Sequence, residues 1–155
     1  MTAEALWPYA LEVYGRPGVE PLLLALQDAR GQCAPYLLWS LWMAASGRGA
    51  DEAALRSGAA LARAWEDAAI APLRRLRRDL KSGPAPGPKP ARERLRQGVG
   101  KLELDAERML LQMLEEASPA PGAAVTPSLE ALVSAARVWG GAAPASDLAR
   151  LAELA

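Results

Sequence analysis

The chain has no histidine and no phenylalanine among its 155 residues, and Cys33 is its only cysteine. The absence of histidine removes the commonest metal ligand, the usual general base near neutral pH and the Ser-His and Cys-His nucleophile systems. One cysteine cannot form an internal disulfide, and without histidine it cannot complete a zinc site. We therefore expect no catalytic residues, no cofactor and no metal site. The apolar neighbours of Cys33 favour a small buried side chain over a reactive thiol.

Runs of apolar residues long enough to cross a bilayer, which needs about 20, are also missing. The most apolar stretch, residues 35–45, is shorter and contains Ser40. The N-terminus has no basic-then-apolar signal segment, and a lone cysteine suits a reducing compartment. These absences predict a cytoplasmic protein without a membrane partner.

The same stretch, residues 35–45, gives the strongest prediction of fold. It is apolar on every side of a helix, and a helix without a polar face must be surrounded by other elements. We found no alternating run typical of a β-strand, and the length of the chain fits one domain. The sequence therefore predicts an all-α, single-domain bundle of about five main helices around a central apolar helix, about 35–46.

Apolar residues spaced three and four apart predict the other helices. Pro8 fits the first helix only in its first turn, and Pro17 is expected to open the second helix. Asp51 is expected to cap the fourth helix, and Pro72 to kink that same helix near Ala71. The predicted main helices cover residues of about 3–14, 17–30, 35–46, 51–81 and 92–116.

Two segments rich in proline, glycine and alanine, residues 82–90 and 118–125, are predicted linkers. Beyond the second, short helices are expected over about 126–139 and 146–154. We accordingly expect a helical bundle over residues 1–117, followed by a linker and short C-terminal helices over residues 118–155 that could pack on it.

Charge is balanced overall but distributed unevenly along the chain. Lysines and arginines number 18, as do the acids, yet residues 72–101 hold ten cations against Asp79 and Glu93, a net charge of +8. If the helices on either side of the 82–90 linker form an antiparallel hairpin, both halves of this basic segment meet at one end. Such a concentration of positive potential favours an acidic partner.

We therefore predict a non-enzymatic protein that contacts an acidic protein surface through this segment. The predicted partner-binding residues are Arg74, Arg75, Arg77, Arg78, Lys81, Arg92, Arg94 and Arg96. The first alternative is RNA or DNA binding by the same cations, although aromatic residues for base stacking are missing from the segment. A plainer interpretation is that the cations pair with acids of the same chain, for which the candidates are Glu66, Asp67, Glu103, Asp105 and Glu107.

Tryptophans suggest a second alternative, a small-ligand-binding or enzymatic helical domain. Tryptophan-rich helix faces can line a pocket or groove, although at helical spacing they also serve as ordinary core, especially without phenylalanine. The candidate lining residues are Trp7, Trp39, Trp42 and Trp65.

Several short motifs occur together in one order. They are Trp7, Pro17-Gly18-Val19, Leu24 to Asp28, the Leu-Leu-Trp-x-x-Trp run of Leu37 to Trp42, Trp65, Pro72 to Arg75, Leu80-Lys81 and Leu102 to Glu107. In this order the chain, over roughly residues 6–116, resembles a family of small uncharacterised proteobacterial proteins, catalogued as a domain of unknown function. The resemblance implies a soluble helical bacterial protein and supplies no activity, cofactor or functional residues.

Overall fold

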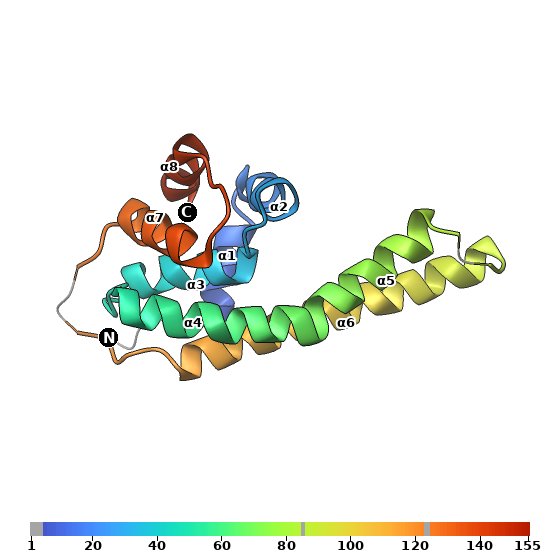
Figure 1. Ribbon diagram of the computed structural model, residues 1–155, viewed down its shortest axis with the longest axis horizontal. Coiled ribbons are helices and arrows are strands. Elements are labelled where there is room, and N and C mark those ends of the chain that lie inside the picture. The colour runs from blue at the N-terminus through green and yellow to red at the C-terminus, as the bar shows by residue number, and fades with distance from the viewer. Residues whose placement is uncertain (1–4, 85, 123–124) are drawn as a thin grey trace. The chain divides into compact units, whose positions relative to one another are not determined.

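The computed structural model describes residues 5–84, 86–122 and 125–155, and the regular structure in these ranges is entirely helical (Figure 1). The predicted all-α fold is confirmed. The elements in chain order are α1 (Leu6–Tyr14), α2 (Val19–Arg30), α3 (Ala34–Ala45), α4 (Glu52–Trp65), the π-helical segment η1 (Glu66–Ile70), α5 (Ala71–Ser82), α6 (Lys89–Glu116), α7 (Ser128–Trp139) and α8 (Ala145–Leu154). None of the helices in the described ranges is long and apolar enough to cross a membrane.

The helices form two compact units, one of Met1–Ala62 with Leu111–Ala155 and one of Arg63–Leu110. In the first unit, α1, α2 and α7 pack against α3, and α8 packs against α2 and α7. The helices that follow the second predicted linker thus belong to the same packed unit as α3.

Helix α3 is the central element of the first unit, as predicted. Every residue from Ala34 to Met43 is buried. Its polar atoms are paired, as buried polar groups must be. The Tyr36 hydroxyl donates to the Leu55 carbonyl at 3.0 Å, the Ser40 hydroxyl to the Leu37 carbonyl at 2.7 Å, and the Trp39 indole N–H to Ser118 Oγ at 2.8 Å. The composition of α3 therefore dictates its position.

The predicted helix starts are partly confirmed. Helix α1 begins at Leu6, which leaves Pro8 in its first turn, while the expected start at Ala3 lies outside the described residues. Asp51 caps α4, because its carboxylate accepts a hydrogen bond from the Ala54 N–H at 2.8 Å.

Two predicted helix starts were wrong. Pro17 does not open the second helix, because Gly18 has φ of +87° and the helix begins only at Val19. Helix α6 begins at Lys89 rather than near Arg92, with Pro90 as its second residue. Proline is accepted there because the first helical N–H groups have no intrahelical partner.

The disturbance expected from Pro72 near Ala71 takes the form of a π-helical turn that ends one residue before Ala71. Residues Glu66–Ile70 form the π-helical turn η1, and the Ala71 N–H donates to the Glu66 carbonyl five residues back. Proline lacks an N–H and its ring clashes with the carbonyl four residues before it. The wider turn moves that carbonyl away, so helical structure resumes as α5 instead of breaking.

Candidate interaction surface

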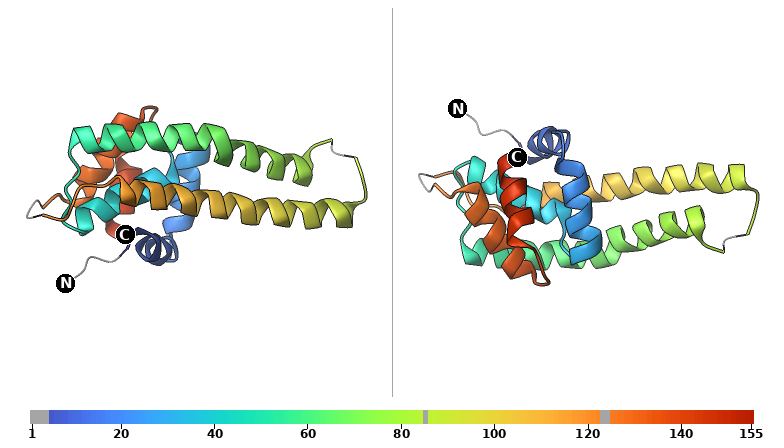
Figure 2. Two further views of the ribbon diagram at one scale, coloured as in Figure 1. Left: turned by 90° about the horizontal axis from the view of Figure 1, so that it is seen from below. Right: turned by 90° about the horizontal axis from the view of Figure 1, so that it is seen from above.

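The second unit is a helical hairpin in which α5 lies beside α6 (Figure 2). The inner face of α6 buries Val99, Ala106 and Leu110, and the opposing segment buries Ile70 and Leu80. The short connection between α5 and α6 brings both halves of the basic segment to the same end. We call residues 74–101 the basic hairpin.

Arg74 is an enclosed cation of the basic hairpin, with 12% of its side chain exposed. Its Nη1 lies 2.8 Å from Glu66 Oε1, its Nε 3.3 Å from Glu103 Oε1 and its Nη2 3.8 Å from Glu107 Oε1. Arg77 pairs with the same Glu103, with Nε 2.6 Å from Oε2. The buried Glu103 therefore bridges two arginines of α5.

This cluster of two arginines and three glutamates perturbs the acid–base behaviour of its members. Burial opposes the charge of Arg74, but Glu66, Glu103 and Glu107 outweigh it and raise the pKa of the Arg74 guanidinium. Burial, followed by the negative charge of Glu103, raises the pKa of the Glu107 carboxyl to about 7, although Arg74 and Arg77 act in the opposite direction. Glu107 therefore titrates near neutral pH.

We expect the hairpin to become more stable as the pH falls from about 7 to about 4.5. The folded state holds a proton on Glu107 more tightly than the unfolded chain does, since the pKa is about 7 when folded and 4.5 ordinarily. Glu107→Gln should remove this dependence and stabilise the hairpin at pH 8 by on the order of 2 kcal/mol. The measurement is the hydrogen-exchange protection of the amides of α5 at several pH values, corrected for intrinsic exchange.

Asp105→Asn serves as the control for this measurement, because Asp105 is an exposed acid on the same helix. It should keep the wild-type pH profile. A Glu107→Gln variant with an unchanged profile would show that Glu107 is not the group that titrates.

The structure separates the predicted partner-binding residues into two groups. Arg74 and Arg77 belong to the buried cluster, Arg96 pairs with Glu93 at 2.9 Å, and Arg92 is half-buried. Part of the basic segment is thus paired within the chain. The exposed cations of the basic hairpin are Arg75, Arg78, Lys81, Lys89, Arg94 and Lys101.

Exposed apolar residues on α6 were missed by the sequence prediction. The three-and-four spacing that includes Leu95, Leu102 and Met109 is typical of a buried face, yet these side chains are 57%, 56% and 48% exposed. The inner face instead includes Glu103, which the arginines of α5 hold inward. The apolar residues of α6 extend around more of the helix surface than one neighbouring helix can cover, so some of them stay exposed to solvent. The repeat of a cation followed by Leu or Met every seven residues is the signal that could have revealed it.

The four tryptophans of the predicted pocket differ in burial and in their contacts. Trp39 and Trp42 are buried in α3, and the guanidinium of Arg48 stacks over Trp42 at 4.4 Å from the ring centre. Trp7 is half-buried on α1. Trp65 belongs to the hairpin unit, where its indole N–H donates to the Ala106 carbonyl at 2.8 Å.

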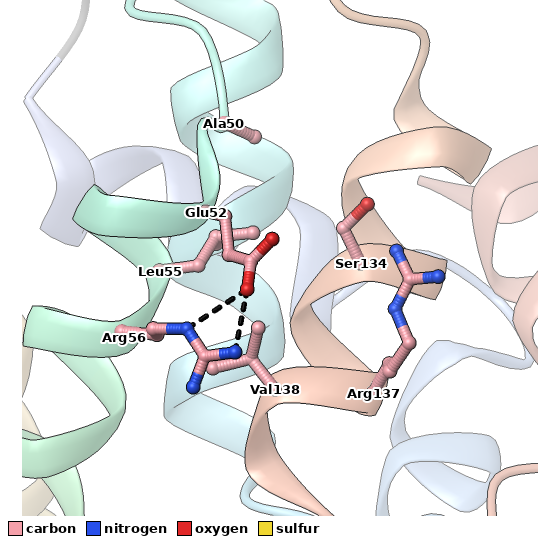
Figure 3. A pocket seen from close by; sticks show the side chains of 7 residues that line it. All are labelled: Ala50, Glu52, Leu55, Arg56, Ser134, Arg137 and Val138. Atoms are coloured by element: carbon pink, nitrogen blue, oxygen red, sulfur yellow. Dashed lines mark hydrogen bonds and ion pairs between the residues drawn. The ribbon is translucent and has the colours of Figure 1, made fainter.

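Two surface hollows of the first unit are lined by other residues. One, of about 230 Å³, is shown in Figure 3, and its Arg56 Nε donates to Glu52 at 2.9 Å. It is lined by Ala50, Glu52, Leu55, Arg56, Ser134, Arg137 and Val138. The other, of about 320 Å³, lies between α7 and α8 around Val133 and Leu148. Within the described ranges, no group of three or more carboxylate or thiol side chains is arranged to hold a metal ion.

Comparison with known proteins identifies a family to which the chain is similar. The model of a family described as "Protein of unknown function (DUF2390)" matches residues 5–114, a range that includes α1 to α5 and the whole basic hairpin. No curated protein and no solved structure matches the chain.

Proposed function

We propose that this chain, which belongs to the DUF2390 family of proteins of unknown function, is a non-enzymatic binding protein of the cytoplasm. Its basic hairpin contacts an acidic surface of a protein partner. The observation that carries the proposal is the set of cations that stay exposed after Arg74, Arg77 and Arg96 have paired within the chain.

Local helix stability accounts for only part of these exposed cations. Lys81 lies in the last turn of α5, where a cation is favourable beside the carbonyl end of the helix. Lys89 lies in the first turn of α6, where the helix dipole disfavours a positive charge. A partner with negative charge would compensate for this cost.

Protein is favoured over nucleic acid as the partner by what lies among the cations. Leu76 and Leu95 are 45% and 57% exposed in the same segment, and Leu102, which directly follows it, is 56% exposed. Phosphate binding needs cations but gains little from aliphatic side chains, whereas the centre of a protein interface requires apolar surface. The segment from 74 to 101 also offers no aromatic side chain for stacking on bases.

The cytoplasmic location is part of the proposal, since the chain has one buried cysteine, Cys33, and no internal disulfide, which suits a reducing compartment. The proposal also states that the protein is not an enzyme. Histidine is missing from the chain, and the glutamates with the closest contacts are occupied by arginines.

We expect charge reversal of Arg75, Arg78 and Lys81 together to release the partner. All three are exposed on α5, so Glu at these positions should leave the fold intact while replacing attraction with repulsion. The measurement is affinity purification of the full chain from an extract of its native host, with and without nuclease. An acidic protein should be retained after nuclease treatment and lost from the triple variant and at high salt.

The matched control reverses Arg30, Arg137 and Arg150, which are exposed cations of the first unit. It changes the net charge by the same amount and should retain the partner. Equal retention by both triple variants would exclude the basic hairpin as the contact surface. Complete loss of the captured material after nuclease treatment would favour the nucleic-acid alternative.

A further inference from the structure

The solvent face of α6 carries a repeated pair of residues, a cation followed directly by a large apolar side chain. The pair recurs every seven residues, and all its members are exposed. The pairs are Arg94-Leu95, Lys101-Leu102 and Arg108-Met109. A seven-residue period is that of a helix whose apolar line faces another helix along its length.

The apolar members form one line because seven residues make nearly two helical turns. From Leu95 to Met109 this line is about 21 Å long, at 1.5 Å per residue. The cations precede it by one residue and form a parallel line, and Asp105 is an exposed acid between Lys101 and Arg108.

Helix α5 contributes to the same side of the hairpin. Arg74 and Glu107 meet on one side, as their 3.8 Å contact shows. Leu76 is two residues after Arg74, so the two side chains point in directions about 200° apart around α5. Leu102 is five residues before Glu107, so these side chains are about 140° apart around α6. Both leucines therefore lie on the side away from the ion-pair cluster, and Leu76 is 45% exposed.

Gly98 lies within the apolar line, between Leu95 and Leu102. A Cβ at this position would have no neighbour within 4 Å, so packing inside the chain does not require glycine there. Glycine destabilises a helix interior relative to alanine. Because Gly98 has no side chain, the backbone of another helix can approach α6 closely at this position.

The charges decide which helix can occupy this face. A second copy of the chain in antiparallel orientation would set its line of cations against the same line, and like charges repel. In parallel orientation the cations would face the positions of Val99 and Ala106, which are buried inside the hairpin and carry no charge. Neither orientation places carboxylates opposite Arg94 and Lys101, which are exposed.

We propose that the face of α6 formed by Leu95, Leu102 and Met109 binds an amphipathic helix of another protein, with apolar residues at heptad spacing flanked by glutamate or aspartate. This inference rests on the proposed function and specifies the partner's chemistry. The apolar line supplies the buried contact, and the cations select an acidic partner and its orientation.

The test uses the full chain and a labelled synthetic peptide of three heptads, with Leu at the first and fourth positions and Glu at the flanking positions. Fluorescence anisotropy at physiological salt measures its affinity. We expect binding that Leu102→Gln weakens about tenfold or more, because Leu102 is the centre of the line. Leu104→Gln should change affinity by less than about twofold, since Leu104 is 52% exposed but about 200° away around the helix.

A peptide with Lys in place of Glu should not bind. Equal binding of both peptides, or equal losses in the Leu102 and Leu104 variants, would overturn the proposal. So would self-association in sedimentation experiments that Leu102→Gln abolishes, because a second copy would then be the occupant. Loss of binding on Lys101→Glu but not on Leu102→Gln would leave the acidic partner standing and exclude the apolar line as its contact.

Discussion

Gly58→Ala is expected to destabilise the first unit by about 2–3 kcal/mol, the upper part of the range for overpacked cores. Gly58 is buried in α4, and a Cβ at this position would overlap the six-membered ring of Trp39. Trp39 is itself buried, and its indole N–H donates to Ser118 Oγ at 2.8 Å, so the ring has little freedom to move. Urea unfolding of the full chain measures the loss.

Gly98→Ala is the matched control, because it makes the same change in a helix at an exposed position with no neighbour within 4 Å. It should stabilise the hairpin by about 0.5–1 kcal/mol through helix propensity alone. The double variant Gly58→Ala with Trp39→Leu should lose less free energy of unfolding than the two single variants lose together, since the smaller leucine side chain removes the overlap. Strict additivity would show that Trp39 does not impose glycine at position 58.

Arg74→Met is expected to destabilise the hairpin unit by about 3–5 kcal/mol near neutral pH. The change keeps most of the apolar stem but leaves Glu66, Glu103 and Glu107 with Arg77 as their remaining partner in the cluster. Removing one partner of an enclosed ion pair leaves uncompensated charge, which costs more than the pair itself contributes. Hydrogen exchange of the α5 amides measures the effect.

The loss should shrink at pH 5, because Glu107, whose pKa is raised to about 7, is then protonated and adds no negative charge to the cluster. Arg75→Met provides the control at the next residue, which is exposed, and should change stability by less than about 0.5 kcal/mol. Comparable losses at positions 74 and 75 would mean that the cluster does not hold the hairpin together.

Helix ends were predicted well where the deciding interaction is local. Asp51 caps α4 because its carboxylate reaches an N–H only three residues away. Gly31, with φ of +67°, ends α2 as expected for a glycine after a helix. Pro17 failed as a helix start because the left-handed Gly18 follows it, and glycine tolerates too many conformations for its φ to be inferred.

From the sequence, the acids that pair with the arginines of the basic segment could be predicted only as a group of candidates. Glu66, Glu103 and Glu107 were among the acids expected to neutralise the arginines, and these three form the cluster. Which acids pair with the arginines depends on the register of α5 against α6, since Arg77 and Glu103 are 26 residues apart in the chain. Exposed Asp105 has the same charge but lies on another face of α6.

The amino-acid sequence alone determined the fold class, the burial of α3 and the presence of a strongly basic segment. These follow from composition and short-range spacing, because a helix that is apolar all round has to be enclosed wherever it lies. Tertiary structure decided which arginines are neutralised within the chain and which apolar residues of α6 remain in solvent. One neighbouring helix covers only one stripe, and the ion pairs of Glu103 determine which stripe that is.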